Sequence, residues 1–127
     1  MNNFIKTDSF ANRLKLALDN AGKKPADVVK ETGIDKSAMS NYRKGTYEPK
    51  QDAIYKIAKC LNVSEMWLWG YDCPMERPIS QKENDELVEL IEKLRNDKGF
   101  RSLVIKLGKL NPDQLEGLMK LMNIPLT

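Results

Sequence analysis

The sequence predicts an all-α protein, and three observations carry this prediction. Apolar residues recur at i, i+3 and i+4 spacing along most of the chain, as they do in helices that bury one face. Capping residues or proline stand where these stretches begin, and glycine or asparagine follows several of them. The chain has 127 residues, which suffice for one domain or two very small ones, so no large catalytic core is expected.

The first half of the chain predicts five helices. The first is capped by Asp8 or Ser9 and ends at Gly22, and the second begins with proline and covers 25–32. The other three are expected at 36–44, 50–62 and 64–69. In the first helix the apolar stripe consists of Phe10, Leu14, Ala17, Leu18 and Ala21.

Residues 25–44 have the outline of a helix-turn-helix, because two helices of about two turns flank a tight turn at Gly33. Met39 and Tyr42 share one face of the second of these helices and are expected to dock it. Its other faces carry Lys36, Ser37, Ser40, Asn41 and Lys44. Taken alone, this stretch also fits an ordinary amphipathic helix, but its neighbours favour a helix that enters a DNA major groove.

The second half predicts a linker and three more amphipathic helices. Residues 71–80 contain two prolines and no periodicity, and Ser80–Glu83 has the form of a capping box that opens a helix reaching about Asp97. The next helices are expected at 100–107 or 100–110, after a break at Gly99, and from Asn111 onward. Because this segment is too small for a large core, we expect it to pack against a second copy or against the first domain. The expected organisation is thus 1–70, a linker 71–80, and a helical segment 81–127.

Composition excludes several classes of chemistry. The chain has no histidine, so Ser-His-Asp catalysis and His-bearing metal sites are ruled out, and we expect no enzyme, metal or cofactor. We expect Cys60 to be a partly buried helix residue and Cys73 a free linker thiol. No apolar run approaches the roughly 20 residues of a membrane span, and no signal peptide is evident, so we expect a cytoplasmic protein. Residues 1–70 carry a net charge of +4 and residues 71–127 one of −1, which is compatible with a phosphate-binding face on the first half.

Four groups of residues together resemble the Xre/Cro-type DNA-binding domain of lambda-repressor-like phage repressors, a five-helix bundle. These are Arg13-Leu14, Gly33-Ile34, Met39–Gly45 with Pro49, and Ile57–Gly70. The helices that follow Tyr71 resemble, less specifically, those of short repressors from phages of Gram-positive hosts. The resemblance implies a transcriptional repressor on the nucleoid, which reads a two-fold operator in double-stranded DNA as a homodimer with helix 36–44 in the major groove.

The resemblance also implies roles for individual residues. The expected base contacts are Lys36, Ser37, Ser40 and Asn41. The expected phosphate contacts are Lys23, Lys24, Arg43, Lys44, Thr46 and Lys50. The expected dimerisation residues are Trp67, Trp69, Leu87, Leu90, Ile91 and Leu94. For the two tryptophans, burial in the core is the alternative.

Three departures from the family pattern affect this transfer. Pro25 stands where the family often has a phosphate-contacting glutamine, and Val29 stands where alanine is usual. Arg43 occupies the position of a glutamate that often pairs with the arginine of the first helix. Either Arg13 pairs with another carboxylate, Glu48 being nearest, or Arg43 turns toward the DNA backbone, and we expect the second because a cation there gains a phosphate.

The alternative function is that of an antitoxin-like or antirepressor-binding protein, whose C-terminal helices capture another protein while DNA binding is secondary. The C-terminal segment is too short for a self-cleaving domain, so induction would come from a partner such as an antirepressor or a protease.

Overall fold

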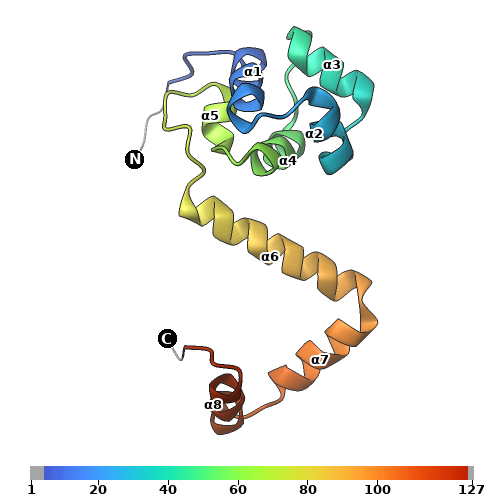
Figure 1. The fold of residues 1–127 in the computed structure, drawn as a ribbon, viewed down its shortest axis with the longest axis vertical. Coiled ribbons are helices and arrows are strands. Elements are labelled where there is room, and N and C mark those ends of the chain that lie inside the picture. The colour runs from blue at the N-terminus through green and yellow to red at the C-terminus, as the bar shows by residue number, and fades with distance from the viewer. Residues whose placement is uncertain (1–4, 126–127) are drawn as a thin grey trace. The chain divides into compact units, whose positions relative to one another are not determined.

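The computed structural model describes residues 5–125, and its regular structure there consists of eight α-helices and two isolated antiparallel bridges (Figure 1). The predicted all-α fold is confirmed. The helices are α1 (Phe10–Ala21), α2 (Pro25–Thr32), α3 (Lys36–Lys44), α4 (Gln51–Leu61), α5 (Glu65–Trp69), α6 (Ile79–Asn96), α7 (Lys98–Gly108) and α8 (Pro112–Leu121). Positions 1–4 and 126–127 of the predicted domains lie outside the described residues.

Local capping chemistry sets the limits of the first helices. Ser9 Oγ accepts a hydrogen bond of 3.1 Å from the Asn12 amide at the start of α1, and the helix ends at Gly22 with φ 64°. Pro25 occupies the first turn of α2, and Gly33, with φ 74°, turns the chain toward α3. Positive φ is strained for residues with a Cβ, so glycine permits both tight turns.

The predicted start of α6 and the predicted break before α7 are wrong. Helix α6 begins at Ile79, directly after Pro78, so Ser80 lies inside its first turn and is not a cap. Asp97 caps α7 by accepting a hydrogen bond of 3.0 Å from the Phe100 amide, and Gly99 is therefore a helical residue. Proline before a first turn and aspartate at an N-cap define these helix starts more strongly than the glycine does.

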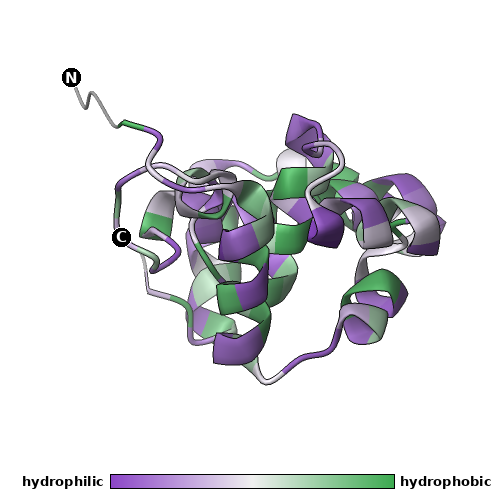
Figure 2. Cartoon of the chain, turned by 90° about the horizontal axis from the view of Figure 1, so that it is seen from above, coloured by the Kyte–Doolittle hydropathy of each residue, from purple (hydrophilic) through white to green (hydrophobic). Residues whose placement is uncertain are grey.

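Helices α1 to α5 enclose one hydrophobic core. Helix α1 packs on α3, α4 and α5, and α2 packs on α3 and α4. Figure 2 shows hydrophobic and hydrophilic residues alternating along the helices, as expected of amphipathic segments. The fully buried large side chains are Phe10, Leu14, Val28, Met39, Ile54, Ile57, Val63 and Leu68.

Residues 71–78, here called the strap, follow the surface of this bundle. The Ser64 amide donates to the Met75 carbonyl at 2.9 Å, and isolated bridges join Tyr71 to Lys6 and Glu76 to Val63. The chain divides into two compact units between Glu83 and Asn84, so the strap belongs to the first unit. The domain limits predicted from the sequence stay predictions.

The second unit, described from Asn84 to residue 125, contains no buried residue in that range. Arg101 ties α7 to the end of α6, since its guanidinium donates to the carbonyls of Leu94 at 2.7 Å and Arg95 at 2.6 Å. Several large apolar side chains nevertheless remain exposed, namely Leu87, Leu90, Ile91, Leu103, Ile105, Leu115, Leu121, Met122 and Ile124. Such a unit has an apolar face that is not covered within the described chain.

A three-membered polar cluster joins α2, α4 and the turn before α2. The Cys60 thiol donates to Glu31 Oε2 at 2.7 Å, while Lys23 Nζ lies 2.9 Å from Glu31 Oε2 and 3.2 Å from the Cys60 carbonyl oxygen. Partial burial, with the hydrogen bond to Glu31, raises the pKa of Cys60 to about 11. As predicted, Cys60 is a partly buried helix residue.

Alkylation of Cys60 is therefore expected to be slow. With its pKa raised from 9.0 to about 11, the thiolate fraction at pH 8 falls roughly a hundredfold, and the rate with iodoacetamide falls with it. Mass spectrometry of the modified peptide measures this rate in the folded protein, with urea-unfolded protein as the reference. Glu31→Gln should accelerate the reaction, and equal rates in folded and unfolded protein would contradict the assigned pKa.

Candidate nucleic-acid interface

Helix α3 is anchored by one face and presents the other. Met39 and Tyr42 are buried and pack α3 against the bundle, and Gly45, with φ 75°, ends the helix. The four predicted base contacts lie at i, i+1, i+4 and i+5, so the structure places them on the face away from this anchor. Of these, Lys36 and Ser37 are exposed, whereas Ser40 and Asn41 are half-buried.

Asp35 and Ser37 interact at the start of α3. The Ser37 hydroxyl donates to the Asp35 carboxylate, and this hydrogen bond is the main reason why the pKa of Asp35 lies below its usual value. A charged carboxylate at this N-terminus is favourable for the helix dipole. The hydrogen bond to Asp35 also fixes the orientation of the Ser37 hydroxyl on the exposed face of α3.

Asn41 is held by an aromatic chain that begins in the core. Its Nδ2 donates to Tyr47 Oη at 3.3 Å. The Tyr47 ring packs edge-on against Tyr42 with centroids 5.7 Å apart, and Tyr42 packs likewise against Phe10 at 6.0 Å. Tyr47 was not predicted as a site residue, although an exposed aromatic residue just after α3 is a usable signal. It positions the Asn41 amide and is itself exposed.

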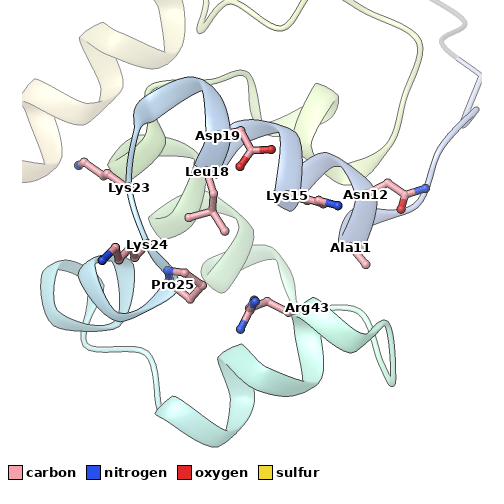
Figure 3. Close-up of a pocket in the computed structure, with 9 residues that line it drawn as sticks. All are labelled: Ala11, Asn12, Lys15, Leu18, Asp19, Lys23, Lys24, Pro25 and Arg43. Carbon is pink, nitrogen blue, oxygen red and sulfur yellow. The ribbon is translucent and has the colours of Figure 1, made fainter.

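Cationic side chains border two hollows beside α3. A groove of about 490 Å³ between the start of α2 and α3 has Pro25, Val29 and Met39 among its lining residues and the cations Lys24, Lys36 and Arg43. A second hollow of about 500 Å³ lies between α1, the start of α2 and the end of α3 (Figure 3). Its charged lining residues are Lys15, Asp19, Lys23, Lys24 and Arg43. Arg43 and Lys24 border both hollows, and Lys15 is a cation that the sequence analysis did not include.

Lys23 differs from the other predicted phosphate contacts. Its ammonium group is paired with Glu31 and bonded to the Cys60 carbonyl, and the hydrogen bond to Glu31 is the main reason why its pKa is raised. A cation that is already neutralised gains less from a phosphate. The remaining candidates, Lys24, Arg43, Lys44, Thr46 and Lys50, are exposed.

Arg13 pairs with another carboxylate, which is the first of the two alternatives that the sequence left open for it. Its Nε lies 3.1 Å from Asp8 Oδ2, its Nη1 donates to the Trp67 carbonyl at 2.8 Å, and its guanidinium lies 4.8 Å from the centre of the Trp67 ring. Glu48 pairs with Lys6 at 2.6 Å. The carboxylate that satisfies Arg13 is therefore Asp8, at the entrance to α1, and not Glu48, which the first alternative named as nearest.

Arg43 is exposed and has no ion-pair or hydrogen-bond partner among residues 5–125. Arg13 is satisfied by Asp8 and by backbone carbonyls, so Arg43 is not needed within the bundle. Its place beside both hollows leaves its charge available to an anion outside the protein.

The predicted dimerisation residues fall into two groups. Trp67 is 8% exposed and lies in the core, and Trp69 is half-buried with its ring against Tyr71. Trp67 therefore offers little area to a second copy. On α6, in contrast, Leu87 is 54% exposed, Leu90 and Ile91 are also exposed, and Leu94 is half-buried.

The part of the chain that the structure describes lacks two other classes of site. No group of three or more Cys, Asp or Glu residues there is arranged to hold a metal ion. None of the helices there is long and apolar enough to cross a membrane.

Comparison with known proteins places residues 11–69 within a family model described as a helix-turn-helix domain. The HTH-type transcriptional regulator ImmR of Bacillus subtilis is 27% identical over 89 residues, which cover 70% of each protein. An uncharacterized HTH-type transcriptional regulator of Haemophilus influenzae is 28% identical over 81 residues, 64% of this chain and 34% of that protein, so this chain spans about a third of its length. A crystal structure of a transcriptional regulator from Listeria innocua aligns with 88% of this chain and 96% of its own at a TM-score of 0.46 and 20% identity.

Proposed function

Because residues 11–69 belong to the helix-turn-helix domain family, we propose that this protein is a transcriptional repressor that binds a two-fold DNA operator as a homodimer. Helix α3 would enter the major groove of each half-site. ImmR, which is similar over most of its length, is a transcriptional regulator by its name. The proposal describes a DNA-binding protein and assigns it no enzymatic activity.

The observation that carries the proposal is the division of α3 into two faces. Its inner face is fixed by Met39 and Tyr42, while Lys36, Ser37, Ser40 and Asn41 lie on the outer one. An asparagine amide pairs bidentately with adenine N6 and N7, and a lysine ammonium donates to guanine O6 and N7. Lys24, Arg43, Lys44, Thr46 and Lys50 are exposed around this helix and would contact phosphates, which fix position without reading sequence.

The homodimer is proposed from the second unit. Its described residues are all at least partly exposed, and α6 carries Leu87, Leu90, Ile91 and Leu94 along one face. A second copy that covers this face would bury apolar area that one chain leaves in water. Dimerisation would also place two reading helices on the operator.

The experiment begins with selection of binding sites from random double-stranded DNA, followed by footprinting on the DNA that flanks the gene. We expect a two-fold site bound with a Kd on the order of 10⁻⁸ M or tighter at physiological salt. Asn41→Ala should weaken the selected site about 5- to 150-fold and relax the preference at one base pair per half-site. Asn20→Ala, an exposed change of the same type on α1, is the matched control. Absence of any protected two-fold site would overturn the proposal.

The exposed apolar face of the second unit also favours a second candidate function, that of an interaction protein which captures another protein with α6–α8. Size-exclusion chromatography with light scattering separates the two. A stable homodimer of the isolated protein supports the repressor, whereas a monomer that also fails to select DNA supports the interaction protein.

A further inference from the structure

Arg77, in the strap, is a buried cation outside the proposed DNA-binding face. It is 2% exposed. Its Nη1 donates to the Val63 carbonyl at 3.0 Å and to Gln81 Oε1 at 3.0 Å, and its Nη2 lies 3.8 Å from Glu65 Oε2. A buried guanidinium is costly unless its donors are satisfied, so this set of partners defines where Arg77 must lie.

Gln81 connects the same cluster to the first turn of α6. Its Oε1 accepts from Arg77 and also, at 3.2 Å, from the Glu65 amide, which belongs to the first turn of α5, where backbone amides need acceptors from outside the helix. Gln81 lies in the first turn of α6, and residues up to Glu83 belong to the first unit. One arginine and one glutamine thus join the strap, the N-terminus of α5 and the start of α6.

The backbone of the strap is fixed at its other end as well. The Tyr71 carbonyl accepts from Arg13 at 3.2 Å, and the Asp72 amide donates to the Ile5 carbonyl at 2.8 Å. Cys73 and Met75 pack against the hydrophobic core. Proline-containing segments without such contacts act as spacers, whereas here the chain from α5 to α6 is bonded along its length.

We propose that Arg77 is a positioning residue for operator recognition, which through Gln81 fixes the start of α6 on the DNA-binding unit and so determines the half-site spacing that the dimer accepts. This inference rests on the proposed function, because it concerns how a dimer formed by α6–α8 carries two reading helices. A dimer can require one helical repeat between half-sites only if the connection to each reading unit is defined. Arg77 and Gln81 fix this connection close to Glu83, where the first unit ends.

The first test needs neither DNA nor a dimer. Spin labels at Asn20→Cys and Glu83→Cys, in a chain with Cys60→Ala and Cys73→Ala, report the distance between α1 and the first turn of α6 by pulsed electron resonance. Dilution with unlabelled protein restricts the signal to one chain. We expect a narrow distance distribution in the parent, and one at least about twofold broader in Arg77→Met and Gln81→Ala. Gln81→Glu keeps the acceptor oxygen, so its distance distribution should be as narrow as that of the parent. Equal distribution widths in all variants would overturn the inference.

The second test measures operator spacing in the full-length protein. Affinity is measured for the selected two-fold site and for sites with about 5 base pairs inserted or removed between the half-sites, half a helical turn. For the parent and Gln81→Glu, affinity for the respaced sites should be about tenfold or more below that for the selected site. For Gln81→Ala the difference should be less than about threefold, and its affinity for a single half-site should equal that of the parent. The same spacing preference in Gln81→Ala and the parent would overturn the inference. If the parent selects no two-fold site, the proposed function fails. The spin-label distances then still test whether Arg77 and Gln81 fix the start of α6 on the first unit.

Discussion

Replacement of Gly70 by alanine is expected to destabilise the protein by about 3 to 5 kcal/mol. Gly70 has φ 115°, and a Cβ built on it would lie 2.1 Å from the Asp8 carbonyl oxygen. The Gly70 carbonyl accepts hydrogen bonds from the amides of Thr7 at 2.9 Å and Asp8 at 3.0 Å. The segments around Asp8 and Gly70 therefore cannot move apart without loss of these bonds. Urea unfolding followed by circular dichroism measures the change.

Gly33→Ala is the matched control for this substitution. Gly33 has φ 74°, but nothing lies within 4 Å of the position that a Cβ would take. Only the cost of positive φ remains, and we expect about 1 kcal/mol. Similar losses at Gly33 and Gly70 would show that the close approach of Asp8 is not what requires glycine at position 70.

Arg43→Glu is expected to weaken binding to the selected operator by about tenfold or more at 0.1 M salt, because one phosphate contact is lost and a like charge is introduced. The slope of log K against log salt should become shallower by about 1. The free energy of unfolding should change by less than about 0.5 kcal/mol, since Arg43 is exposed. Fluorescence anisotropy at several salt concentrations measures both quantities.

The control for Arg43→Glu is Lys82→Glu, which changes the net charge by the same amount. Lys82 is exposed in the first turn of α6, four residues after Pro78 of the strap. Its variant should bind the operator with nearly the parent affinity and the parent salt slope. If the Arg43 variant also kept both, Arg43 would not contact the DNA backbone.

Helices α1 to α5 and the anchor of α3 could be predicted from the sequence because their determinants are local. Pro25, Gly33 and Gly45 mark helix limits by their own backbone preferences, and the 3.6-residue period placed Met39 and Tyr42 on the buried face. These signals act within a few residues, so neither an alignment nor a tertiary contact was needed to find them.

The partners of the charged residues could not be predicted in this way. Arg13 bonds to Asp8 but also to carbonyls of Trp67 and Tyr71, which are more than fifty residues away in the chain. Arg77, in a stretch with no periodicity, was not identified as buried, because backbone bridges and carbonyl acceptors leave no pattern in the side chains. The candidate base contacts stay predictions, since they depend on a DNA sequence that the chain does not contain.

The two-faced structure of α3 has a consequence for how such a protein changes over generations. Its fold depends on Met39 and Tyr42, whereas Lys36 and Ser37 are exposed and Ser37 bonds its near neighbour Asp35. Substitutions at the exposed positions should alter stability by less than about 0.5 kcal/mol. On the proposed function, new operator preferences would therefore arise by single mutations without compensating changes in the core. Asn41 is the exception, because a change there also releases Tyr47 from its hydrogen bond.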